Sequence, residues 1–181
     1  MLPENIINQT RTWLASFIIN YNICPFAKRE YDKESIRYAV IESADIEQCL
    51  ESVIKECLQL DSGTEIETTL IIFPNNFNHF DDYLDFLNIA ETLLIDQGFE
   101  GTYQLASFHP DYCFEGEKQD DPANYTNRSP YPMLHLIREK SLENALSSYP
   151  HPEKIPERNI SLTRQLGREK LQAILQECYN S

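Results

Sequence analysis

The chain has 181 residues, of which 41% are hydrophobic and 24% are charged, and its formal net charge is −14. A domain of this length buries roughly 70% of the surface that its unfolded chain exposes, and this composition is typical of a globular protein rather than a disordered one. No apolar run approaches the roughly 20 residues that cross a bilayer, and the first residues lack the basic and apolar segments of a secretory signal. We therefore expect one domain over residues 1–181, with a core over about 8–175, in the cytoplasm.

The negative charge is concentrated in the middle of the chain. Residues 41–123 carry 19 acidic residues against only Lys55 and Lys118, whereas residues 124–181 carry eight basic and six acidic residues. A nucleic-acid-binding face needs clustered basic residues that displace counterions, so we expect neither nucleic acid nor a membrane as a partner. The acidic block is typical of a solvated surface, and a surface that meets a basic protein is the alternative.

The first 108 residues show hydrophobic patterns that alternate between helical and strand-like spacing. In chain order they predict a helix over 5–21, a strand over 35–43, a helix over 45–63, a strand over 67–73, a helix over 77–97 and a strand over 102–108. Strands that are joined through helices are usually parallel, with helices packed on the sheet. We therefore predict a small α/β domain of two or three layers with about three strands and with further helices at both ends. A ferredoxin-like α+β fold with one additional strand is the alternative.

The pattern changes after Phe108. Residues 109–131 contain prolines, aromatic residues, asparagines and aspartates without periodicity, and loops of this length in compact domains are usually functional or disordered. The aromatic content favours an ordered, functional loop. A helix is predicted to begin at Pro132, because proline suits the first helical turn, and a last amphipathic helix is predicted over 160–178.

Most residues that could do chemistry lie from the end of the third strand to the start of the predicted helix at Pro132. Ligands of open α/β sheets bind beyond the carboxyl ends of the strands. We predict that the catalytic residues in this zone are His109, Asp111 and His135. The predicted substrate-binding residues, whose arginines could hold a carboxylate or phosphate, are Asn124, Asn127, Arg128 and Arg138. The alternative is structural, with the arginines capping loop carbonyls and the asparagines bonding to their own backbone.

A divalent metal is one option for this zone. His135 and Glu139 are four residues apart and would share one face of the predicted helix, so with His109 they could hold zinc, iron or manganese. The two histidines could instead do acid–base work near neutral pH, and a simple hydrogen-bonded pair of His135 and Glu139 is the structural alternative.

Cys24 is a further candidate catalytic residue. The five cysteines are an odd number without C-x-x-C spacing, so neither a disulfide framework nor a zinc knuckle is expected. Cys24 precedes Pro25 at the end of the first helix, and the nearby Lys28 and Arg29 would lower the pKa of its thiol. It could instead ligate haem iron, sense the redox state or be a small buried residue.

Four segments of the chain resemble a family of bacterial proteins of unknown function. They are NICPFAK, LIIFP, QLASFHPDYCF and NYTNRSPYPMLHLIRE, and the resemblance covers roughly residues 8–175. It implies a compact bacterial cytosolic domain and no established activity. The matching positions include Cys24, His109, Asn124, Arg128 and His135, which fall in the two zones identified above.

These observations favour an enzyme with a pocket of histidine, aspartate, asparagine and arginine that acts on a small anionic molecule. One alternative is a non-catalytic haem- or redox-sensing protein that uses Cys24, and another is a module that binds a protein partner. The chain lacks a glycine-rich phosphate loop, a G-x-S-x-G elbow and an H-E-x-x-H motif. The P-loop, α/β-hydrolase and zincin mechanisms are therefore disfavoured.

Overall fold

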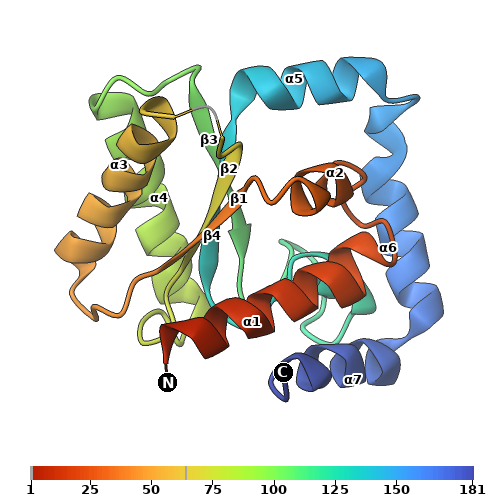
Figure 1. Ribbon diagram of the computed structural model, residues 1–181. Helices are drawn as coiled ribbons and strands as arrows, with labels where there is room; N and C mark the ends of the chain where they lie inside the picture. The colour runs from red at the N-terminus through yellow and green to blue at the C-terminus, as the bar shows by residue number, and fades with distance from the viewer. Residues whose placement is uncertain (1, 64) are drawn as a thin grey trace.

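The computed structural model describes residues 2–63 and 65–181. Its centre is a four-stranded mixed sheet in the order β1-β2-β4-β3 (Figure 1). The strands are β1 (Ile36–Val40), β2 (Thr68–Ile72), β3 (Tyr103–Phe108) and β4 (Met133–Arg138). The edge strand β1 runs parallel to β2, whereas β4 pairs antiparallel with both β2 and β3.

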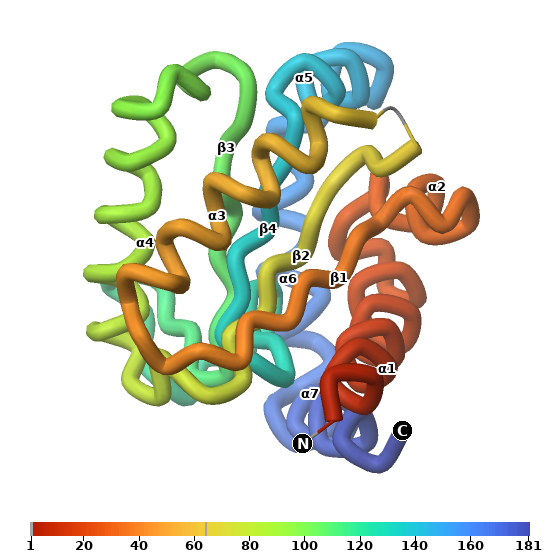
Figure 2. The backbone as a smooth tube through the Cα atoms, turned by 60° about the vertical axis from the view of Figure 1, so that its left-hand side comes forward, coloured from red at the N-terminus to blue at the C-terminus, as the bar shows by residue number. Residues whose placement is uncertain are grey.

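Helices pack on both faces of the sheet and form three layers, as Figure 2 shows. On one face, α3 (Ile46–Asp61) and α4 (Phe80–Asp96) contribute to a hydrophobic cluster that includes Ile71 and Leu134, here called the α3/α4 cluster. On the other face, α1 (Pro3–Trp13) and α7 (Arg168–Cys178) contribute to a second cluster that includes Leu70 and Met133, here called the α1/α7 cluster. The remaining segments are η1 (Leu14–Ile19), α2 (Ala27–Asp32), η2 (Pro122–Thr126), α5 (Glu139–Ser148), η3 (Pro152–Lys154) and α6 (Ile155–Leu166).

This architecture confirms the predicted α/β class and settles it as three-layered. The ferredoxin-like alternative, with helices on one face of the sheet, does not describe the chain. None of the helices in residues 2–63 and 65–181 is both long enough and apolar enough to cross a membrane.

The prediction of a helix from Pro132 is wrong, because its first part is the strand β4. This strand lies between β2 and β3, so Leu134 and Leu136 pack into the α3/α4 cluster while Met133 packs into the α1/α7 cluster. A strand that is covered on both faces has no regular polar alternation, and its apolar run therefore resembles a buried helix. The helix α5 begins only at Glu139.

Strands β2 and β3 have the same direction, as expected for strands joined through a helix. Between them lies β4, a fourth strand where the sequence predicted about three. The predicted last helix is two helices, α6 and α7. They are separated at Gly167, whose φ of 77° is a conformation that glycine adopts without steric cost.

The first predicted helix is present, and it ends in the π-helical segment η1. In this segment the backbone N–H of Asn20 bonds to the carbonyl of Ala15 and that of Ile23 bonds to the carbonyl of Ile18, each five residues back. Short π-helical turns are rare and occur frequently at functional sites. The outer face of α1 and η1 therefore belongs among the candidate functional surfaces.

Candidate functional site

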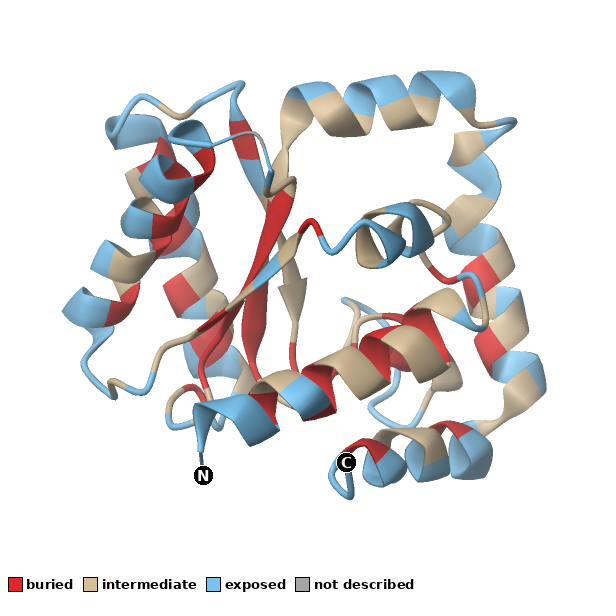
Figure 3. Cartoon of the chain, viewed as in Figure 1, coloured by how far each residue is buried: buried red, intermediate tan, exposed pale blue. Residues whose placement is uncertain are grey.

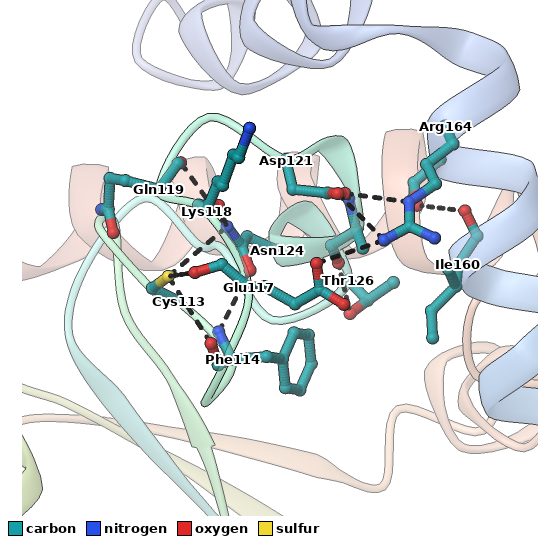
Figure 4. Close-up of polar contacts among 12 residues, drawn as sticks. Cys113, Phe114, Glu117, Lys118, Gln119, Asp121, Asn124, Thr126, Ile160 and Arg164 are labelled. Carbon is teal, nitrogen blue, oxygen red and sulfur yellow. Dashed lines mark hydrogen bonds and ion pairs between the residues drawn. The ribbon is translucent and has the colours of Figure 1, made fainter.

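Asn124, predicted to bind substrate, instead organises the loop between β3 and β4. Its side chain is fully buried. Its Oδ1 accepts a hydrogen bond from the backbone N–H of Phe114 at 3.0 Å, and its Nδ2 donates to the carbonyl oxygen of Lys118 at 2.8 Å (Figure 4). Asn124 therefore connects two stretches of the loop, and these contacts use both ends of its amide.

The side chain of Arg128 bonds to the backbone of the same loop. It is only 9% exposed, and its guanidinium lies 4.8 Å from the ring centroid of Tyr125. Its Nε donates to the carbonyl of Tyr112 at 3.1 Å, and its Nη2 donates to that of Gln119 at 2.7 Å. The guanidinium thus caps loop carbonyls, which is the structural alternative that the sequence left open.

The side chains of Asn127 and Arg138 also donate hydrogen bonds to backbone carbonyl oxygens. Asn127 donates from Nδ2 to the carbonyl of Ser107, which ties the loop to β3. Arg138 lies at the far end of β4, where its Nη2 donates to the carbonyl of Leu60 in the last turn of α3 at 2.6 Å and its Nη1 donates to the Tyr103 hydroxyl at 3.1 Å. The structure therefore does not bring Arg128 and Arg138 together.

An ionic latch holds the exposed, acidic part of the loop against α6. Arg164 of α6 donates from Nη2 to Asp121 at 2.9 Å and to Glu117 at 3.2 Å (Figure 4). Hydrogen bonds from the Arg164 side chain and from the Ala123 backbone hold the pKa of Asp121 below its usual value. The latch therefore favours the charged form of Asp121 and ties an otherwise exposed segment to α6.

His109, predicted to be catalytic, is buried, and both of its ring nitrogens lie within hydrogen-bond distance of backbone atoms. It is 1% exposed, and the rings of Phe80 and Tyr83 lie with their centroids 5.2 Å from the imidazole on the α4 side of the sheet. Nε2 lies 2.8 Å from the carbonyl of Phe77, which can only accept, and Nδ1 accepts from the backbone N–H of Asp111 at 3.0 Å. Burial lowers its pKa, so the ring is neutral with both nitrogens occupied.

His135 faces the opposite side of the sheet. Its neighbours in β4, Leu134 and Leu136, point into the α3/α4 cluster, so His135 points toward the α1/α7 side. Nε2 lies 2.7 Å from the Thr68 hydroxyl. Burial lowers its pKa to about 4, although part of the side chain remains exposed. His135 therefore lies deep among protein atoms but is still reached by solvent.

The predicted metal ligands are not assembled. His109 and His135 lie on opposite faces of the sheet, and Glu139 begins α5 rather than sharing a helical face with His135. Across the part of the chain that the structure describes, no group of three or more histidine, cysteine, aspartate or glutamate side chains is placed to hold a metal ion. Asp111 is exposed, and its hydrogen bond to His109 is made by its backbone N–H and not by its carboxylate.

Cys24 does not have the activated thiol that its basic neighbours suggested. Burial raises the pKa of this thiol, and the backbone N–H groups of Phe26 and Ala27 offset only part of that rise. Lys28 and Arg29 are exposed and pair with acidic side chains of α2 instead. The side chain is half-buried against the α1/α7 cluster.

A groove that the sequence analysis missed runs along the outer face of α1 and η1. It has a volume of about 650 Å³ and is lined by Asn8, Arg11, Thr12, Ala15, Ser16, Asn20, Tyr31 and Ser181. The sequence does carry a signal for it. Asn8, Thr12, Ser16 and Asn20 recur every four residues and form a polar stripe on the predicted first helix.

Arg11 has the charged side chain among the residues that line this groove. Its guanidinium carbon lies 5.8 Å from the ring centroid of Tyr31 in α2 and 5.6 Å from that of Tyr38 in β1. Its side chain makes no hydrogen bond or ion pair with any residue in 2–63 or 65–181, and it is only half-buried. The two aromatic rings orient the guanidinium and leave its N–H donors available.

These features define a three-layer α/β protein with an ordered, internally bonded loop on one side and an arginine-centred groove on the other. The chain belongs to the family described as "Protein of unknown function (DUF1415)", whose model matches residues 5–173. No curated protein and no solved structure matches the chain. The family membership inferred from the four sequence segments is thereby confirmed, and it brings no activity with it.

Proposed function

We propose that the protein binds a small anionic molecule in the groove along α1 and η1, with Arg11 as the anchor. The observation that carries this proposal is a half-buried guanidinium without a carboxylate partner in a chain with a net charge of −14. Other arginines are engaged within the protein. Arg37 and Arg164 pair with carboxylates, and Arg128 and Arg138 bond to carbonyl oxygens.

The groove has the donors that an oxyanion needs. A guanidinium presents a planar fork that matches a carboxylate or phosphate. Asn8, Thr12 and Asn20 line the same wall, and their side chains make no hydrogen bond to another described residue. An amide N–H or a hydroxyl beside the guanidinium can complete the coordination of a ligand oxygen.

The ligand is still the small anionic molecule expected from the sequence. The arginine that would bind it is Arg11, in place of the predicted Arg128 and Arg138. An enzyme that acts on such an anion remains part of the proposal, without an assigned reaction. We place it in the cytoplasm, because all five cysteines are free thiols, which is usual in reducing compartments.

Titration with inorganic phosphate and with citrate, followed by the thermal midpoint and by the Nε–Hε resonances of the arginines, tests the proposal. Bound ligand in 100-fold excess over its Kd stabilises the folded state by about 2.7 kcal/mol, which raises the midpoint by roughly 5–10 °C in a chain of this size. One of the two anions should therefore saturate with a shift of the Arg11 resonance.

The variant Arg11→Gln should lose this saturable response. Arg168→Gln is the matched control, because Arg168 is exposed, begins α7 and does not line the groove. Equal weakening in both variants would indicate a general charge effect, and a wild type without saturation by either anion would contradict the proposal.

A further inference from the structure

His135 is held in one tautomer by a chain of hydrogen bonds. The hydroxyl of Thr68 lies 2.5 Å from the carbonyl oxygen of Leu136, and this oxygen can only accept, so the hydroxyl donates to it. Nε2 of His135, 2.7 Å away, must therefore donate to the hydroxyl oxygen. The proton sits on Nε2, and Nδ1 is left as an acceptor that no residue in the described part of the chain satisfies.

The surroundings of His135 are apolar and incompletely covered. Ala106 is its register partner on β3, and Ile137 is the next residue of β4 on the same face. Both are only half-buried, and neither belongs to the α1/α7 cluster, which covers the part of this face around Leu70 and Met133. Burial alone accounts for the lowered pKa of His135, without a contribution from any charged side chain.

Helix α5 lies on the same side of the sheet with an apolar face of its own. It directly follows β4, and Tyr149 at its end packs edge-on against Phe26, with ring centroids 5.5 Å apart. Phe26 in turn precedes Ala27, which packs on the α1/α7 cluster. Figure 3 shows that α5 has no buried residue, and its apolar Leu142 and Leu146 are half-buried and outside both clusters.

From these placements we infer a second binding site, for a small uncharged molecule with an apolar body and one O–H or N–H donor, on the sheet face beside α5. The donor would bond to Nδ1 of His135, and the apolar body would lie against Ile137 and the apolar face of α5. A solvent-accessible acceptor without a protein partner, beside the apolar Ala106 and Ile137, favours an uncharged ligand, because a charged one would lose its hydration without gaining a partner. Thr68 is a positioning residue, since it fixes the tautomer. This site shares no residue with the proposed groove.

Phenol and fluorobenzene are matched probes, because they have nearly the same size and only phenol donates a hydrogen bond. In the full chain with ¹⁵N-labelled histidine, phenol should shift the Nδ1 resonance of His135 saturably. It should bind roughly tenfold more tightly than fluorobenzene, as one net hydrogen bond provides. Thr68→Val should reduce this preference and alter the tautomer signal, whereas Arg11→Gln should leave both unchanged.

Modification by diethyl pyrocarbonate gives a second measurement that needs no variant. The unprotonated, partly exposed Nδ1 of His135 should react and should be protected by phenol, while His109, whose nitrogens are both bonded and buried, should not react. The exposed His79 and His151 are positive controls for the reagent. An unreactive His135, an Nδ1 resonance that phenol does not shift, or equal affinity for phenol and fluorobenzene would each overturn the inference.

Discussion

Replacing Asn124 by alanine tests whether the asparagines of the long loop are scaffold or ligand-binding groups. In the folded protein the fully buried amide accepts from the N–H of Phe114 at 3.0 Å and donates to the carbonyl of Lys118 at 2.8 Å. Asn124→Ala removes both bonds and leaves the two backbone groups to find other partners.

The loss in the free energy of unfolding depends on whether each of the two backbone groups can find another hydrogen-bond partner. An unsatisfied buried donor costs roughly 1–3 kcal/mol, and Phe114 is half-buried, so its N–H bears most of this penalty. Lys118 is exposed, so water can reach its carbonyl and reduce the second penalty. We expect a loss of about 2 kcal/mol in the free energy of unfolding, which corresponds to roughly 4–8 °C in the thermal midpoint.

Urea unfolding followed by far-UV circular dichroism measures this loss. The midpoint should fall with an unchanged slope, as expected when stability changes without a change in the exposed surface. Asn144→Ala on the exposed side of α5 is the control and should change stability by less than about 0.5 kcal/mol. An Asn124→Ala variant that is as stable as the wild type and yet loses anion binding would identify Asn124 as a ligand-binding group and not as scaffold.

Three further predictions concern side chains outside the groove. Because the pKa of His135 is lowered to about 4 in the folded state, against about 6.5 in the unfolded state, the unfolded state alone binds this proton between those values. Wild-type stability therefore falls as the pH drops through this window, by roughly 3 kcal/mol from this group, and urea unfolding of His135→Gln at pH 7 and at acidic pH should show a smaller loss. Arg138→Met removes donors from the last turn of α3, so it should cost about 1–2 kcal/mol and speed amide exchange in that turn; an unchanged exchange rate would contradict its capping role. Arg164→Gln opens the latch on the acidic part of the loop, so trypsin should cleave after Lys118 faster than in the wild type, and high salt should accelerate wild-type cleavage in the same way. Equal cleavage under all three conditions would show that the latch does not order the loop.

The elements that sequence analysis located best are those whose pattern depends on one covered face. The helices α3 and α4 each carry an apolar stripe toward the sheet, and their acidic residues other than Glu56 lie toward solvent. Helical periodicity is therefore visible without knowledge of the partner. The strand β4 lacks such a pattern, because apolar residues on both of its faces pack against residues far away in the chain.

In the candidate site, too, some features are visible in the sequence and others depend on tertiary contacts. The residue types of the long loop are visible in the sequence, and its aromatic content predicted that it is ordered. The structure shows the physical reason, because buried asparagine and arginine side chains bond to the loop backbone. Whether Arg128 or Arg11 is free to bind a ligand is not visible, because it depends on which partners folding brings within hydrogen-bond distance. The family was thus indicated by the resemblance of four sequence segments, and the α/β class and most of the elements were determined by local composition and periodicity. The position of β4, the separation of His109 from His135 and the availability of Arg11 were decided only by the tertiary structure, because each depends on contacts between segments distant in the chain.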